Sequence, residues 1–142
     1  MKCIVYKGGY KYQLKRGYSV QIPLRPAQPI DTEYIQLDAT GNLGLKEGYA
    51  WDGPSGPTID TPDFMRGSLV HDALYQLMRE NLLDHDNYRE AADNTLRAIC
   101  REDGMSALRA WWVYHGVRLF GDPAADPADS HPLTHAPKGC EP

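Results

Sequence analysis

The sequence predicts an α+β fold, in which a small antiparallel β-meander is followed by a three-helix unit and a Pro-rich C-terminal tail. Residues 1–52 hold six of the nine tyrosines and several short runs of alternating apolar residues, a pattern typical of strands. Residues 60–121 repeat their apolar side chains at helical spacing, and five prolines lie in 122–142. Because the strands precede the helices, the order favours α+β over alternating α/β.

The predicted sheet has four or five strands separated by the turn residues Gly8-Gly9, Arg16-Gly17 and Gly41-Asn42. Prolines at 23, 26 and 29 predict an edge strand or an irregular loop, because proline cannot donate to a strand ladder. The predicted strands are Ile4–Tyr6, Tyr10–Leu14, Tyr18–Leu24, Tyr34–Asp38 and Leu43–Trp51.

Three helices follow, and their ends carry capping signals. Thr61 is an N-cap residue before Pro62, so the first helix is predicted to run to about Arg79. Asp86 is the predicted N-cap of the second helix, over 87–103, which Gly104 ends. The third is predicted to start near Ser106 and to end at Gly121. The short connections predict antiparallel neighbours.

The length of 142 residues fits one domain. We expect a single α+β domain over 1–121 and a flexible tail or partner-docking arm over 122–142, because the tail holds too little apolar surface to order itself. The net charge of −4 divides into +3 for residues 1–50, −4 for 51–121 and −3 for 122–142. This balance argues against broad nucleic-acid binding, which needs a strongly basic surface.

Cysteine use suggests a reducing compartment, and hydropathy argues against a membrane span. Cys3, Cys100 and Cys140 cannot all pair within one chain, and none lies in a CxxC motif. No apolar run reaches the ~18 residues that a membrane span needs, and the N-terminus lacks the apolar core of a signal peptide. We therefore expect no transmembrane segment and no secretion signal.

The segment from Gly48 to Met78 carries the chemistry. At 100° per residue, His71 falls on the apolar face of the first helix and Asp72 on its flank. His71 could transfer protons near neutral pH, and Asp72 could bind a hard cation such as calcium. The alternative is a core histidine beside a carboxylate that pairs with Arg79 or accepts from Ser68.

Asp93 on the second helix is predicted to lie at the edge of that helix's apolar face. If the first two helices are antiparallel, Asp93 reaches the His71 ring and fixes its tautomer, the role of an orienting group in a catalytic triad. The alternative is an exposed pair with Arg89 or Arg97.

The loop before the first helix holds Asp52, Gly53, Ser55 and Gly56. Glycines allow a backbone to turn its carbonyls or amides toward an ion or an oxyanion. The alternative is a rigid connector between strand and helix.

The third helix is apolar nearly all round, which predicts burial on several sides. One side is expected to face another chain or a lipid surface through Trp111, Trp112 and Phe120, together with the tail. Alternatively, the sheet and the other helices cover it. His115 is expected to pack beside the tryptophans.

Two resemblances follow from these motifs. The series Asp52-Gly53-x-Ser55, His71-Asp72-x-Leu74-Tyr75 and Arg89-x-x-Ala92-Asp93 resembles a family of small phage and prophage proteins known as a domain of unknown function. The likeness covers about residues 4–121. It implies a viral origin, synthesis in the host cytoplasm and a later place in the virion.

The glycine-rich loop and the His-Asp-x-x-Tyr helix also look like the core of secreted phospholipase A2. The resemblance implies a calcium-dependent hydrolase of phospholipid esters with His71 as base and Asp93 and Tyr75 as orienting groups. It implies calcium bound by Asp72 and by the loop residues Asp52, Gly53, Ser55 and Gly56.

Two other functions remain open from the sequence. One is a virion or assembly component in which the His/Asp/Tyr cluster is structural and other phage subunits, or further copies of this chain, bind the third helix and the tail. The other uses His71-Asp72, His85-Asp86 and Asp93 and resembles phosphohydrolases with a doubled histidine and aspartate signature.

Overall fold

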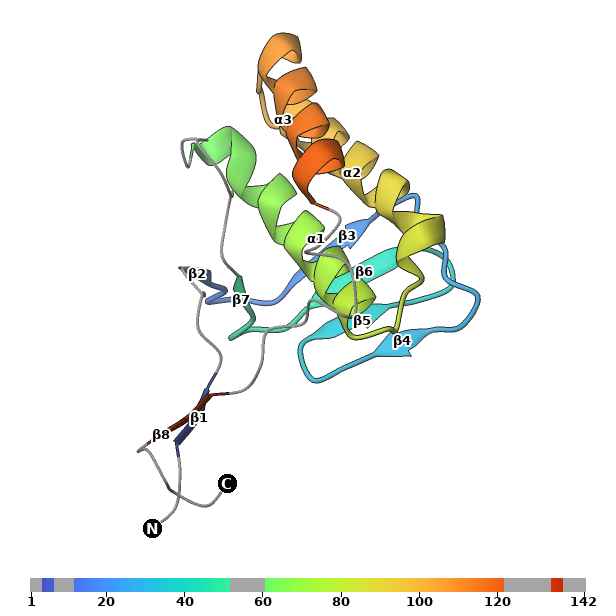
Figure 1. Cartoon of the computed structure of the whole chain (residues 1–142), viewed down its shortest axis with the longest axis vertical. Helices are drawn as coiled ribbons and strands as arrows, with labels where there is room; N and C mark the ends of the chain where they lie inside the picture. Colours follow the sequence, from blue (N-terminus) through green and yellow to red (C-terminus); the bar gives the residue numbers. More distant parts are fainter. Residues whose placement is uncertain (1–3, 7–11, 52–60, 122–133, 137–142) are drawn as a thin grey trace.

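The computed structural model describes residues 4–6, 12–51, 61–121 and 134–136 of the chain. Seven strands precede three helices, and an eighth strand follows them (Figure 1). The predicted α+β class is confirmed. None of the helices in these ranges is long and apolar enough to cross a membrane.

The larger sheet has four antiparallel strands in the order β3-β6-β5-β4. Its strands β4, β5 and β6 form the expected meander, whereas β3 lies beyond β6 rather than beside β4. The connection from β3 to β4 contains the three prolines and returns the chain along the sheet as in a Greek key. The strands are β3 (Tyr18–Gln21), β4 (Ile30–Asp31), β5 (Ile35–Leu37) and β6 (Asn42–Leu45).

Two short strand pairs complete the β structure. Strand β2 (Tyr12–Gln13) pairs with β7 (Ala50–Trp51), and β1 (Ile4–Tyr6) pairs with β8 (Thr134–Ala136). The predicted strand over 43–51 is thus divided in two. Gly48 has a φ of +94°, and the Tyr49 amide donates to the Lys46 carbonyl, so the chain turns between β6 and β7. The pairing of β8 was not predicted from the tail's composition.

The helices are α1 (Pro62–Arg79), α2 (His85–Glu102) and α3 (Ala107–Phe120). Their ends match the predictions at Pro62, Gly104 and Ser106. The N-cap of α2 is Asp84 and not Asp86, because the Asp84 side chain accepts from the Asp86 amide. The carboxylate two residues earlier thus satisfies an amide that has no partner within the helix.

The hydrophobic core has two parts. The first fills the space between the four-stranded sheet and α1, with contributions from α2, and includes Leu37, Leu43, Leu74 and Leu77. The second joins α3 to the other helices. Its buried residues are Phe64, Leu96, Cys100, Met105, Ala110 and Val113. Helix α1 is therefore buried on most of its circumference, and α3 lies on the side of the helix pair away from the sheet (Figure 1).

Candidate functional site

His71 lies in the middle of α1, on the face that packs inside the molecule. Its apolar neighbours on this face, Val70 and Leu74, have no exposed surface, and His71 keeps 7% of its surface exposed. The helical wheel places seven residues on this face. All are buried: Phe64, Gly67, Val70, His71, Leu74, Tyr75 and Met78. The predicted inward orientation of His71 is therefore confirmed.

Asp93 reaches His71 from α2. The first two helices are antiparallel and joined by a short connection (Figure 1), and Asp93 Oδ1 lies 2.7 Å from His71 Nε2. Asp93 has no exposed surface, so the alternative of an exposed pair with Arg89 or Arg97 is wrong. Since α3 covers this side of α2, a position that would be exposed on a helix pair becomes buried in the three-helix unit.

Tyr75 completes the predicted group one turn after His71. Its hydroxyl donates to the same Oδ1 of Asp93 at 2.5 Å, and its ring centroid lies 4.0 Å from that of His71. The structure thus brings His71, Asp93 and Tyr75 together. One carboxylate oxygen accepts from both side chains of α1.

Two arginines belong to this network and were not predicted as site residues. Arg118 of α3 donates to Asp93 Oδ2 at 3.0 Å. Arg89 of α2 donates to the Tyr75 hydroxyl at 3.3 Å and to the carbonyls of Val117 and Arg118 at 2.9 and 2.8 Å. The signal for Arg118 was its position as the one arginine or lysine in residues 110–120, the most apolar part of the sequence. A cation there requires a carboxylate partner or solvent.

The electrostatics favour an ionised Asp93. Burial is the largest single influence and raises the pKa of this carboxyl, but the hydrogen bonds and charge of its partners outweigh it. His71, Tyr75 and Arg118 together lower the pKa of Asp93 below 3.8. Burial and the hydrogen bond to Asp93 raise the pKa of Tyr75 well above 10, so Tyr75 remains a neutral donor.

These charges fix the tautomer of His71. An ionised carboxylate only accepts hydrogen bonds, so Nε2 of the histidine carries the proton that points at Asp93. In the neutral ring, Nδ1 then has the lone pair. The arrangement can therefore accept a proton at Nδ1 while Asp93 stabilises the imidazolium that forms.

The predicted calcium ligands are only partly within the described structure. Asp72 lies on α1 beside His71 and is half-buried. Asp52, Gly53, Ser55 and Gly56 lie outside the described residues. Asp72 offers the oxygen chemistry that calcium prefers. It is turned about 100° away from His71 around the helix, so it does not compete with Asp93 for the His71 ring.

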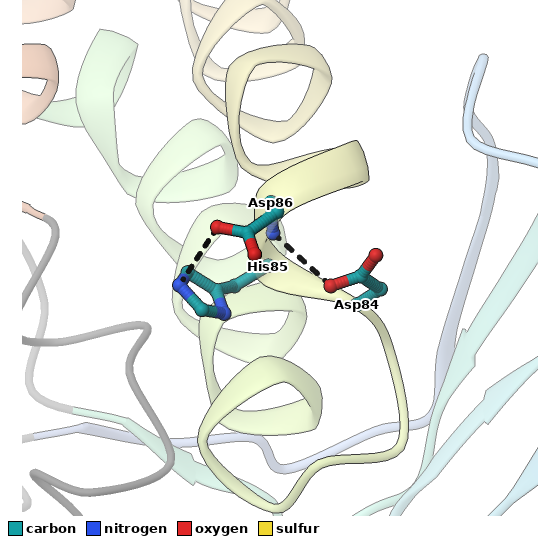
Figure 2. Close-up of side chains that lie close together, drawn as sticks. All are labelled: Asp84, His85 and Asp86. Carbon is teal, nitrogen blue, oxygen red and sulfur yellow. Dashed lines mark hydrogen bonds and ion pairs between the residues drawn. The ribbon is translucent and has the colours of Figure 1, made fainter.

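A second acidic group lies at the start of α2 (Figure 2). Asp84, His85 and Asp86 bring one ligand atom each within 4.8 Å of one another, and they are the only group of three such residues in the described part of the chain. His85 Nε2 lies 3.2 Å from Asp86 Oδ1. His85 is eight residues from Asp93, which is about 12 Å along a helix, so the predicted centre that combines His71, His85 and Asp93 does not form.

The remaining predicted residues lie on α3. Trp111 and Trp112 are 46% and 56% exposed, so the other helices and the sheet do not cover them. His115 is exposed but its ring packs 4.4 Å from that of Trp111. Phe120 ends the helix, and its side chain lies outside the described structure.

Comparison with models of protein families, with curated proteins and with solved structures finds no match to this chain.

Proposed function

We propose that this protein is a hydrolase of ester substrates in which His71 acts as general base. The observation that carries the proposal is the hydrogen bond of 2.7 Å between His71 Nε2 and the buried carboxylate of Asp93. A base needs a group that holds its ring and stabilises its protonated form. Asp93 has the position and the charge for both tasks.

The proton transfers follow from this geometry. A water molecule gives its proton to Nδ1 of His71, and the hydroxide adds to the ester carbonyl carbon. When the tetrahedral intermediate collapses, the ester C–O bond breaks and the alkoxide takes the proton from Nδ1. Asp93 remains ionised throughout, and the hydrogen bonds from Tyr75 and Arg118 hold it in place.

The substrate class is a phospholipid ester, and calcium is the cofactor. This part of the proposal is supported by the resemblance of the motifs to secreted phospholipase A2, and by the carboxylate of Asp72 beside the base. Asp72 and the loop residues 52, 53, 55 and 56 would hold the ion. Bound calcium would stabilise the negative charge that develops on the carbonyl oxygen. A phage or prophage origin belongs to the same proposal and places the substrate in a host envelope.

The test is ester hydrolysis by the full chain, with calcium and with a chelator. We expect His71→Gln to lower kcat by about 10²–10⁴-fold, the contribution typical of a general base, and Asp93→Asn to lower it to a similar extent. His115→Gln, assayed on a soluble ester, is the matched control, because this histidine is exposed and outside the network. Thermal unfolding of each variant shows whether it folds.

One observation favours a second function, that of a non-enzymatic virion or assembly component. Among the described residues, no buried side-chain nitrogen or oxygen lacks a hydrogen-bond partner, and the Asp93 network joins all three helices. A satisfied network of this kind also stabilises a unique helix arrangement. The same experiment separates the two functions. If folded wild-type protein hydrolyses no ester with calcium, and His71→Gln only destabilises it, the network is structural.

A further inference from the structure

Helix α3 has a second apolar face that points to solvent. Leu108, Trp111, Trp112, His115 and Leu119 lie within about 100° of one another around the helix. Leu108 is 76% exposed and Leu119 is 74% exposed, and the two tryptophans are about half exposed. Four of the six exposed large hydrophobic side chains in the described residues are on this one face. We call these five residues the α3 stripe.

The stripe is distinct from the face that holds α3 in the fold. Ala110 and Val113 are buried and Val117 packs against the same cluster; all three lie on the opposite side of the helix. Folding of this chain therefore does not require tryptophans on the outer face. A continuous apolar patch of this kind marks a binding surface.

The charged side chains of α3 itself are two arginines. No Asp or Glu occurs between Ala107 and Phe120. Arg109 and Arg118 flank the stripe at about +100° and −80° from Leu108, and their side chains remain 31% and 30% exposed. Each arginine binds a carboxylate inside the molecule, Asp63 or Asp93. Because a guanidinium has five donors, the exposed part of each can also bind an anion beside the stripe.

The size of the stripe argues against a second copy of this chain as its partner. A helix of 14 residues is about 21 Å long and 10 Å wide. A stable dimer buries about 800 Å² per subunit, which is far more than one such helix face offers. An outward helix with tryptophans, leucines and flanking arginines instead has the composition of helices that lie in a lipid interface.

We propose that the α3 stripe binds the surface of a phospholipid bilayer that contains anionic headgroups. Trp111 and Trp112 enter the boundary between headgroups and acyl chains, where their amphipathic rings are most stable, and the two arginines meet lipid phosphates. Arg118 contacts Asp93 and directly precedes Leu119, so the same helix end would hold the site close to the lipid. The biological purpose of this surface rests on the proposed function.

Vesicles of ether-linked phosphatidylcholine and phosphatidylglycerol test the proposal, because they contain no carboxylic ester for the protein to cleave. We expect wild type and His71→Gln to sediment with the vesicles, more strongly as the phosphatidylglycerol content rises. Tryptophan emission should shift to shorter wavelength on binding, with buried Trp51 contributing a constant background. The double variant Trp111→Ser/Trp112→Ser should lower the bound fraction about tenfold or more.

The controls keep the test decisive. Leu82→Ser removes an exposed leucine outside α3 and should bind like wild type. If the tryptophan variant fails to fold, Leu108→Lys/Leu119→Lys replaces it at the two most exposed positions. Binding that is unchanged by loss of the stripe, wild type that stays in the supernatant, or a dimer that dissociates when the stripe is altered would overturn the proposal.

The result is separable from that of the proposed function. If the protein hydrolyses soluble esters but does not bind vesicles, only the proposal of a lipid-binding surface is disproved. If the protein binds ether-lipid vesicles through the stripe but cleaves no ester, only the proposed hydrolase function is disproved.

Discussion

Arg118 and Asp93 form an ion pair of 3.0 Å between the last turn of α3 and the middle of α2. Arg118 binds Oδ2 of the carboxylate, whereas His71 and Tyr75 of α1 bind Oδ1. Asp93 is therefore held from two sides, and each of the three helices contributes to the site. Docking of α3 and orientation of His71 are linked through this one carboxylate.

Arg118→Gln should destabilise the protein by about 1–3 kcal/mol. The change removes a charged donor from a carboxylate that has no exposed surface, and hydrogen bonds to charged groups contribute about 1.5–3 kcal/mol. The partial exposure of Arg118 places the effect toward the lower end. Urea unfolding measures it. Arg97→Gln is the control, because the Arg97 guanidinium lies over the Tyr114 ring and contacts of this kind are worth only about 0.5–1 kcal/mol; equal losses would contradict the prediction.

The free energy of unfolding should fall with pH below about 4, in part because of Asp93. The native pKa of Asp93 is lower than 3.8, so the unfolded chain binds a proton at a higher pH than the native protein does. The contribution of Asp93 to the free energy of unfolding is therefore complete at a pH above the pKa of an unfolded Asp. It is lost as the pH falls through the pKa that Asp93 has in the native protein.

Urea titrations between pH 2.5 and 7, in wild type and in Asp93→Asn, measure this dependence, and the variant should show a shallower slope in the acid range. Asp38→Asn is a useful comparison, because hydrogen bonds from the Thr40 side chain and the Asn42 amide also lower the pKa of Asp38. Identical acid slopes in wild type and Asp93→Asn would show that Asp93 is not the group responsible.

Gly67→Ala should destabilise the protein and reduce any activity of the site. A Cβ at this position would lie 2.8 Å from Cys100 Sγ and 3.3 Å from the Leu96 carbonyl, so α1 and α2 would have to separate. Overpacking of this kind costs about 1–3 kcal/mol, and the site one turn away depends on the same helix spacing.

Gly116→Ala is the matched control. That glycine is also helical but has open space around its Cβ direction, so alanine should stabilise by about 0.5–1 kcal/mol; a stabilising Gly67→Ala would disprove the close approach.

Cys100 should react very slowly with thiol reagents in the folded protein. Burial is the main reason that its pKa rises to about 12, and the thiolate is the reactive form. The variant Cys3→Ser/Cys140→Ser isolates this thiol. Its rate of reaction with a disulfide reagent should increase sharply in denaturant, and rapid reaction without denaturant would contradict the burial.

The sequence was sufficient for most of the helix ends. Pro62, Ser106 and Gly104 mark helix ends because proline, serine and glycine act through their own backbone or the next few residues. The sheet order was not predictable in the same way. The position of β3 beside β6 depends on pairing between residues about 25 positions apart, and alternation of apolar residues contains no information about the neighbour.

The part of the site that lies on α1 and on the adjacent α2 was predictable from the sequence. His71 and Tyr75 are one turn apart, so the wheel alone places them together. The full burial of Asp93 and the contacts of Arg118 and Arg89 depend on where α3 docks. That docking depends on tertiary structure, and the spacing of apolar residues within one helix does not show where another helix packs.

The order of these residues along the chain has a consequence for synthesis. Because the carboxylate of Asp93 is completed by Arg118, a growing chain on the ribosome contains His71 and Asp93 well before it contains the residue that holds the second oxygen. The carbonyls that Arg89 binds arrive at the same late stage. The network is thus assembled only when the last turn of α3 has been made and has folded back, so maturation of the site coincides with completion of the helical unit rather than with its beginning.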